Sequence, residues 1–488
     1  MTTATPPPPP ATAAAAPGLR TLPRRVFDGF GAVDRGVACY AEPRSAEEVV
    51  ALFRRASEER VPVSMRGWGR SYGDAAMNNG NLLLDMRAMK RVLSWDPQAG
   101  IIECEPGLTI NDLWQHTLPD GWWPPVTTGT SWPTLGAAAA MNVHGKNHYK
   151  MGGLGDWILE VDLATPSGEL LTLSREEEAD LFHAAVGGFG MLGCFTRIKL
   201  QLKKVHGGRL WVKEWTEPTL HDAIDSFRDA ENHDYFVGWT DCIGKGSKGR
   251  SQMHWADYTK DGDDPEGKAT LLVDAQKLPG SMLGVPAGLV PVVLGILYKH
   301  NAGVWLTNTV KYAAAKILSG KTFYQPHAAF HFLLDQMPGF RGAYQPGGFI
   351  QYQPFVPAEN AVAVFREIFE VSKRRGVMSY LGVLKKYRPD EFLLSHGLDG
   401  FSMALDYPVT KSNKETLWTM CHEFNDLVID AGGKFYPAKD QVLRPSDVQR
   451  MFGEETLGAL EAHRRRVDPE RILRTELSAR FGLNGPVA

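Results

Sequence analysis

Two glycine-rich segments contain the residues of this chain best suited to hold a phosphorylated ligand. The first is a run of nine residues: Arg66, Gly67, Trp68, Gly69, Arg70, Ser71, Tyr72, Gly73 and Asp74. Its glycines permit positive φ and close backbone approach, and successive N–H groups in such a turn form a nest for phosphate oxygens. Ser71 and Tyr72 add hydroxyl donors, and Arg70 adds positive charge. A single loop of this kind also occurs in surface hairpins, so the interpretation depends on the second segment.

The second segment, residues 136–148, combines small residues with side chains that exchange protons. Gly136 and the four alanines after it suit a helix packed closely against a ligand, and His144, Lys146 and His148 follow. The first segment lacks the Gly-Lys-Ser/Thr sequence of a P-loop. Together the two segments predict a protein that holds a large dinucleotide and carries out redox chemistry on a polar substrate.

Strands and helices are predicted around both loops. Residues 60–65 form a predicted strand that leads into the first loop, and residues 82–85 and 101–104 predict two more strands. Ser45 with Glu48, and Thr109, predict the starts of helices. From about residue 206 the pattern changes to long antiparallel strands rich in aromatic residues, with helices on one face of the sheet. The predicted fold class is therefore α+β.

Composition limits the possible classes of protein. A chain of 488 residues, 43% hydrophobic and 22% charged, is globular and long enough for two domains. The net charge of −3 and the shortness of the densest basic run, residues 464–466, argue against nucleic acid as a partner. The five cysteines are scattered without metal-ligand spacing, so we expect reduced thiols and no metal site.

Two segments fall outside this pattern. Residues 1–18 form a Pro/Ala tract that we expect to be a disordered tail. Residues 282–297 are apolar, but they include Pro286 and Pro291 and are too few to span a bilayer. Two alternatives remain for this second segment: a buried hairpin, or a loop that rests on a membrane surface.

The order of these motifs resembles the vanillyl-alcohol-oxidase family, whose members share a PCMH-type FAD-binding domain. The resemblance is carried by residues 66–74, by the small-residue helix and by the sequence His-Gly-Lys-Asn-His at residues 144–148. Within the family it is strongest to the oxidase subunits of decaprenylphosphoryl-ribose epimerases. It covers nearly the whole chain after the tail and includes residues 347–353, 406–408 and 436–440.

The resemblance implies a two-domain α+β fold. After the tail at 1–18, residues 19–202 would bind FAD, residues 203–430 would form an inserted substrate domain of antiparallel sheet plus helices, and residues 431–488 would return to the FAD domain. Arg70 stands where relatives with covalent flavin place a histidine, so noncovalent FAD is expected. Besides the nine residues of the first loop, the implied cofactor-binding residues are Thr130, Gly136, Ala137, Ala140, Asn142, Val143, His144, Phe195 and Tyr436.

The chemistry implied is FAD-dependent oxidation of a secondary hydroxyl, at C2 of a polyprenyl-phosphoryl pentose, to a keto sugar. This would be the first half of an epimerisation for arabinose-type cell-envelope glycans, and a separate NAD(P)H-dependent keto-reductase would complete it. Lys439 would be the base, provided that its pKa is lowered toward neutrality, with His144 and Tyr72 beside it. The implied substrate-binding residues are Lys146, Trp239, Tyr324, Gln351, Gln353, Lys385, Ser402 and Ala404.

Two positions depart from the family pattern, and several alternatives stay open. Ala404 replaces a cysteine that close members often carry, and Ser402 stands where asparagine is common. These changes leave an oxidase in place but affect which lipid-linked sugar fits. One alternative is an oxygen-using alditol or aldonolactone oxidase, and another is a flavin-binding scaffold or sensor without turnover. A cytoplasmic location is expected, with peripheral contact at the inner membrane as an open alternative.

Overall fold

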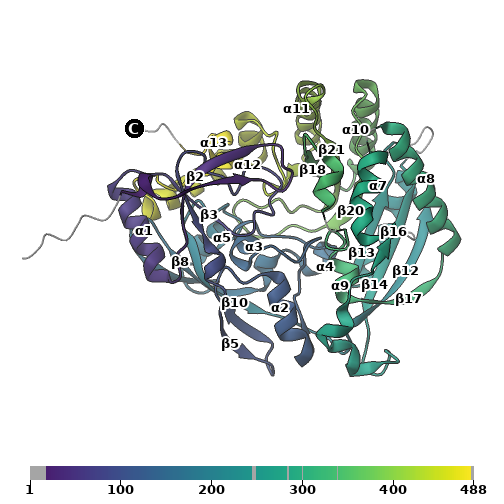
Figure 1. Cartoon of the computed structure of the whole chain (residues 1–488), viewed down its shortest axis with the longest axis horizontal. Helices are drawn as coiled ribbons and strands as arrows, with labels where there is room; N and C mark the ends of the chain where they lie inside the picture. Colours follow the sequence, from purple (N-terminus) through teal and green to yellow (C-terminus); the bar gives the residue numbers. More distant parts are fainter. Residues whose placement is uncertain (1–17, 244–248, 283–284, 299, 338, 485–488) are drawn as a thin grey trace, which may run out of the picture.

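The computed structural model describes residues 18–243, 249–282, 285–298, 300–337 and 339–484. The predicted tail lies outside the described residues except for Gly18. The fold is mixed α and β, which confirms the predicted class. Elements up to about residue 202 lie on one side of the molecule, and the later strands with α7 and α8 lie on the other (Figure 1).

Two sheets form the first half. In the described residues, one has the order β1-β2-β4-β3, with β4 parallel to both of its neighbours, and the other has the antiparallel order β5-β6-β10-β8-β9. The helix after Ser45 begins as predicted, because the Ser45 hydroxyl accepts from Glu48 N, and its Val49, Phe53 and Ala56 are buried. The strands are β1 (Arg24–Asp28), β2 (Arg35–Ala41), β3 (Val63–Arg66), β4 (Leu82–Asp85), β5 (Val92–Asp96), β6 (Ile101–Cys104), β8 (Ile158–Ala164), β9 (Leu170–Ser174) and β10 (Cys194–Gln201).

Short helices connect these strands. They are α1 (Ala46–Glu58), α2 (Ile110–Thr117), α3 (Leu135–Ala140), α4 (His148–Met151) and α5 (Ala179–Ala185), and a small pair joins β7 (Trp122–Trp123) to β11 (Lys203–Lys204). Thr109 and Asp112 form a reciprocal capping box at the start of α2, as the sequence predicts. The five cysteines are buried, and none forms a disulfide in the structure.

A large antiparallel sheet forms the second half. Among the described residues it has nine strands in the order β17-β12-β14-β13-β20-β21-β19-β22, with β18 also paired to β21. The strands are β12 (Arg209–Glu217), β13 (Tyr235–Thr240), β14 (Ser251–Tyr258), β17 (Thr322–Pro326), β18 (Phe349–Tyr352), β19 (Pro354–Pro357), β20 (Gly382–Tyr387), β21 (Gly400–Pro408) and β22 (Lys434–Phe435).

Helices cover both faces of this sheet, so the expectation of helices on one face is wrong. On one face, the Tyr407 hydroxyl of β21 is hydrogen-bonded to Ser372 of α10 (Ala361–Arg375). On the opposite face, the ring of Trp239 contacts Lys311 of α8 (Asn301–Leu318). Both faces carry apolar side chains that must be covered. Further helices are α6 (Leu220–Asp225), α7 (Val290–Leu297), α9 (His327–His331) and α11 (Lys414–Asp430).

The last segment joins the two halves. Its β22 pairs with β19 of the large sheet, whereas Val63 N donates to Ile472 O and Arg474 N donates to Val63 O in the first half. The helices of this segment are α12 (Pro445–Val467), kinked at Gly453, and α13 (Glu476–Arg480). The domain boundaries at 202 and 430 stay predictions.

The apolar segment 282–297 is described except for residues 283–284 and differs from the first of the two predictions, whereas its contact with a membrane stays a prediction. Residues 290–297 form α7, with Pro291 in the first turn, where proline is tolerated. The side chains of Val292 and Ile296 are 59% and 62% exposed, so the buried hairpin is wrong.

Candidate active site

The first glycine-rich loop follows β3 directly and contacts the C-terminal segment. Gly69 has φ of +61°, and Tyr72 N donates to Ala438 O at 2.9 Å. A Cβ on Gly73 would lie 2.4 Å from Asp440 O, so only glycine permits this approach. The backbone therefore holds residues 66–73 beside residues 438–440.

The small-residue helix α3 presents an open side. Ala138 and Ala139 are buried, whereas Gly136, Ala137 and Ala140 keep solvent contact. Asn142 follows at a φ of +39° and accepts from Gly155 N at 2.8 Å through Oδ1. A ligand could thus approach the backbone of α3 without meeting a large side chain.

Several buried polar atoms here have no hydrogen-bond partner in the described part of the protein, which indicates whether a dinucleotide could bind. Among the described residues, Arg70 Nε and Asn142 Nδ2 are buried without a hydrogen-bond partner, as are Gln351 Oε1 and Gln353 Oε1. Such atoms are costly unless a ligand or water pairs them. A glycine cradle, a small-residue helix and unpaired donors together fit a large polar cofactor.

Other predicted cofactor residues already make protein contacts. Arg66 donates to Ala76 O and Asp28 O, and Asp74 pairs with Arg480. Trp68 is partly exposed, and its ring lies 5.5 Å from that of Trp132. Val143 and Phe195 are buried. Arg66 and Asp74 therefore position the loop through the protein itself.

An open pocket of about 360 Å³ adjoins the loop. Arg70 and Thr130 line it together with Asp335, which accepts from Thr130 Oγ1 at 2.5 Å. Phe340 and Arg341 also line this pocket. Its wall thus combines two arginines with apolar side chains.

Two lysines without a salt-bridge partner among the described residues, Lys385 and Lys439, lie close to each other near the glycine-rich loop. Lys439 Nζ lies 5.5 Å from the centre of the Tyr72 ring. In the described part of the chain, the side-chain amines of Lys385 and Lys439 form no hydrogen bond or salt bridge. Burial, and after it the Lys385 ammonium, lower the pKa of Lys439 to about 7, and the Asp406 carboxylate opposes this change. Burial lowers the pKa of Lys385 to about 8. Lys439 can therefore be a neutral amine near pH 7.

His144 is at the centre of a buried ring cluster. Its Nδ1 lies 2.9 Å from His396 Nε2, and its Nε2 lies 3.2 Å from Gln353 Nε2. Tyr436 packs on it with ring centres 4.5 Å apart. Burial, followed by the Lys385 ammonium, holds the pKa of His144 well below its ordinary value, so the imidazole is neutral.

The two predicted glutamines project from adjoining parts of one strand segment into this region. Gln351 Nε2 donates to Asp406 Oδ1 at 2.6 Å, and Gln353 Nε2 donates to Ser402 Oγ at 2.8 Å. Burial raises the pKa of Asp406 to about 6. The unpaired carbonyl oxygens of both glutamines remain available to accept hydrogen bonds from a ligand.

Strand register decides which other predicted residues belong here. Lys385 pairs with Ser402, and Val383 pairs with both Ala404 and Trp239, so these side chains share one face. Tyr324 lies on β17 at the far edge of the sheet, points to the opposite face and donates to Asp263 O. The structure therefore brings together all the predicted substrate residues of the sheet except Tyr324.

Lys146 lies at the border of the cluster. Its Nζ donates to Phe330 O and lies 4.3 Å above the Phe330 ring. Burial and then the Lys385 ammonium lower the pKa of Lys146 to about 7. His148, in contrast, accepts a hydrogen bond from Arg388 N and packs on the Tyr387 ring. Its role is therefore to position neighbouring side chains of the cluster.

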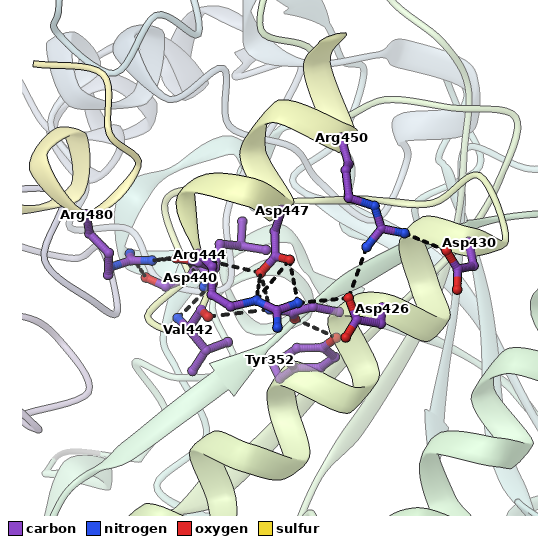
Figure 2. Close-up of polar contacts among 11 residues, drawn as sticks. Tyr352, Asp426, Asp430, Asp440, Val442, Arg444, Asp447, Arg450 and Arg480 are labelled. Atoms are coloured by element: carbon purple, nitrogen blue, oxygen red, sulfur yellow. Dashed lines mark hydrogen bonds and ion pairs between the residues drawn. The ribbon is translucent and has the colours of Figure 1, made fainter. Parts of the chain in front are cut away.

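Figure 2 shows how the segment that carries Lys439 is held. The Asp440 carboxylate accepts from Val442 N, Leu443 N and Arg480 Nη1. Arg480 also donates twice to Asp74 at 2.9 Å. One guanidinium thus ties the glycine-rich loop to the segment after Lys439.

Three residues of the cluster were missing from the sequence-based site: His396, Tyr387 and Asp406. Asp406 lies in a motif that carried the resemblance and could have been included. His396 lies in an irregular segment without periodicity, and it contacts a residue 252 positions away in the sequence. Local sequence contains no signal for such a contact.

Comparison with known proteins agrees with this geometry. An FAD binding domain matches residues 37–174. Decaprenylphosphoryl-beta-D-ribose oxidase of Mycolicibacterium smegmatis is 30% identical over 467 residues, which is 93% of this chain and 97% of that protein.

More distant relatives share shorter stretches. D-lactate dehydrogenase of Anaerostipes hadrus is 26% identical over 33% of this chain and 35% of its own length. Cytokinin dehydrogenase 7 of Oryza sativa subsp. japonica is 29% identical over 36% of this chain and 34% of its own length. Only about a third of the chain is thus shared with these two oxidoreductases.

Proposed function

Because the chain belongs to the family of FAD-dependent oxidoreductases that includes decaprenylphosphoryl-beta-D-ribose oxidase, we propose that it oxidises the C2 hydroxyl of a polyprenyl-phosphoryl pentose to a keto group. The keto sugar would then be reduced by a separate NAD(P)H-dependent reductase, so that the pair of reactions inverts one carbon. The observation that carries the proposal is the unpaired Lys439 beside Tyr72, with a pKa of about 7.

The cofactor is held without a covalent bond. The loop 67–73, Thr130, the open side of α3 and residues 142–144 would hold the dinucleotide, and Phe195 and Tyr436 would contact its flavin end. Arg70 cannot form the bond that histidine makes in covalent flavoproteins. The chemistry that FAD supplies when bound is acceptance of a hydride.

Lys439 Nζ accepts the proton of the substrate hydroxyl. A base of this kind works best when its pKa is near the working pH, and it contributes about 10²–10⁴-fold in rate. The Lys385 ammonium favours the neutral form of Lys439. The hydroxyl of Tyr72 and the neutral His144 orient the same hydroxyl group.

The remaining residues position the sugar and its phosphate. Gln351 and Gln353 accept hydrogen bonds from sugar hydroxyls through their unpaired oxygens. Lys146 and Lys385 face the phosphate. Trp239, Ser402 and Ala404 form the wall of the site, and Tyr324 is left out because the register turns it away.

Anaerobic mixing of the purified flavoprotein with substrate tests the proposal, with loss of flavin absorbance as the readout. A polyprenyl-phosphoryl ribose should bleach wild-type protein, whereas Lys439→Ala should bind FAD normally and bleach at least about 100-fold more slowly. Lys386→Ala is the control lysine, because Lys386 lies on β20 and its amine pairs with Glu231.

The alternatives predict other outcomes. Bleaching by a free alditol or aldonolactone, and not by the lipid-linked sugar, would identify an oxidase of small polyols. Failure of every sugar to bleach the flavin would indicate a scaffold or sensor. Unchanged bleaching of Lys439→Ala would remove Lys439 as the base.

A further inference from the structure

The helices α7 and α8 have the reverse of the usual surface pattern, in which polar side chains face water. On α8, polar side chains point inward: Asn308 Nδ2 donates to Asp241 Oδ1 at 2.9 Å, and Thr309 Oγ1 accepts from Arg250. Lys311 Nζ lies 4.1 Å above the Trp239 ring. The inner side of α8 is therefore occupied by polar contacts with the sheet.

The outer side of both helices is apolar. Ile296 and Ile317 are 62% and 77% exposed. We call the exposed side chains of this surface the apolar face; its main members are Val292, Ile296, Trp305, Leu306, Val310 and Ile317. The two helices that carry these side chains pack against each other at one end of the molecule (Figure 1). Many exposed apolar side chains on two packed helices are typical of an interaction site.

The stretch of sequence that carries the apolar face has charges of one sign only. The sequence from Ala275 to Leu334 contains no aspartate or glutamate, although the whole chain has 56. Lys277, Lys316 and Lys321 are exposed in this stretch. The chain as a whole is negative, at −3, so the positive charge is local. Positive charge beside apolar side chains and an exposed Trp305 is the composition of a surface that meets anionic lipid.

The apolar face adjoins the entrance of the site. Helix α7 packs against residues 340–344, of which Phe340 and Arg341 line the open pocket beside Arg70. Gly339, in the same pocket wall, lies close to Pro291 of α7. A surface that held α7 would therefore lie next to the pocket. None of the helices in the described residues is long and apolar enough to cross a membrane.

We propose that the apolar face docks onto a bilayer that contains anionic lipid, with α7 and α8 lying in the interface and the lysines contacting headgroups. Docking does not require catalysis. Its use for catalysis rests on the proposed function, because a lipid-linked substrate would then pass from the bilayer into the adjacent pocket.

Flotation of the purified holoprotein with vesicles tests the docking. Vesicles of phosphatidylcholine with phosphatidylglycerol should carry the protein to the top of the gradient, and vesicles of phosphatidylcholine alone should carry less. Ile296→Glu/Ile317→Glu should bind at least about tenfold more weakly, because charge replaces two apolar side chains. Lys316→Gln/Lys321→Gln should reduce binding to the anionic vesicles about tenfold and leave binding to neutral vesicles unchanged.

Matched controls separate docking from folding and from catalysis. Val26→Glu/Leu170→Glu places the same charges on similarly exposed positions of the first half and should bind vesicles like wild type. With a short-chain, water-soluble substrate, the Ile296→Glu/Ile317→Glu protein should bleach its flavin at the wild-type rate. Loss of bleaching in every protein would contradict the proposed function and leave the vesicle result intact.

Three results would overturn the docking proposal. The first is wild-type protein that does not float with anionic vesicles. The second is equal flotation of Ile296→Glu/Ile317→Glu and wild type. The third is a wild-type dimer in analytical ultracentrifugation that Ile296→Glu/Ile317→Glu converts to monomer without any vesicle binding, which would assign the apolar face to a second copy of the chain.

Discussion

At the scale of single residues, the site contains several basic side chains and few carboxylates to pair with them. Lys385 and Lys439 lie close enough for one ammonium to lower the pKa of the other, and Asp406 is the carboxylate that opposes this effect. His144 is neutral for the same reasons of burial and nearby positive charge. An uncharged amine or imidazole can accept the proton of a hydroxyl group. The protonated forms of these groups cannot accept it.

The pH dependence of flavin bleaching should follow the ionisation of Lys439. Its pKa is lowered to about 7, so the reactive neutral form is lost as the pH falls. Below about pH 7 the rate should fall about tenfold per pH unit, and above it the rate should level off. Stopped-flow absorbance over a pH series measures this profile.

Removal of the neighbouring charge should shift that profile. Lys385→Gln removes a charge that lowers the pKa of Lys439, so the midpoint should move to higher pH. Lys386→Gln, on the next position of β20, should leave the midpoint where it is. A midpoint that moves down in Lys385→Gln would contradict the electrostatic account.

At the scale of elements, the segment 436–444 is held by side-chain hydrogen bonds on either side of Leu443 in sequence. Asp440 satisfies two backbone N–H groups and Arg480, and Asp447 accepts from Arg444 and Asn425 (Figure 2). This bracing holds Lys439 without a direct bond to its amine.

Asp440→Ala should destabilise the protein by about 3–5 kcal/mol, because it leaves a mostly buried guanidinium without one partner. Urea unfolding at a fixed FAD concentration measures the change. Arg450→Gln is the control: its partners Asp426 and Asp430 are exposed, so the loss should be below about 1 kcal/mol. Equal losses in the two variants would contradict the bracing role.

The contact between the glycine-rich loop and the segment 438–440 depends on one glycine, Gly73. A side chain at Gly73 would meet the backbone at Asp440, at a cost of about 1–3 kcal/mol in strain. Gly73→Ala should therefore weaken FAD binding about tenfold, as measured by quenching of flavin fluorescence. Gly458→Ala, where a Cβ has no neighbour within 4 Å, should bind FAD like wild type.

At the scale of the whole molecule, the proposed cofactor site is assembled from distant parts of the chain. The glycine-rich loop and α3 come from the first half, whereas Tyr436 and Lys439 come from the segment that follows the large sheet. A ligand bound there contacts segments that are otherwise joined by side chains such as Arg480.

Removal of FAD should lower the thermal stability of the entire chain. A ligand that binds only the folded state stabilises it by about 4 kcal/mol at a thousandfold excess over its Kd. Apoprotein should melt at lower temperature in calorimetry, and added FAD should restore the melting temperature in proportion to the logarithm of its concentration. Riboflavin, which lacks the phosphates and adenosine of FAD, should raise the melting temperature only slightly. Full restoration of the melting temperature by riboflavin would argue against contacts to the phosphates.

The local parts of this protein could be predicted from sequence. The glycine-rich loop, the cap at Thr109, the small-residue helix and the resemblance that singled out Lys439 all depend on residues within a few positions of each other. Short-range preferences of the backbone decide such features, and they act wherever the segment is placed. The α+β class and the family follow from the same local motifs.

The tertiary structure decided which of these residues meet. Tyr324 was expected in the site, yet alternation along β17 and the order of strands place it on the other face and at the far edge. His396 contacts His144 across 252 residues, and α7 exposes apolar side chains where a buried hairpin was one of two predicted alternatives. The pKa of Lys439 depends on Lys385 from another strand. Burial, register and electrostatic neighbours are properties of the folded chain, because they depend on residues that sequence separates and packing brings together.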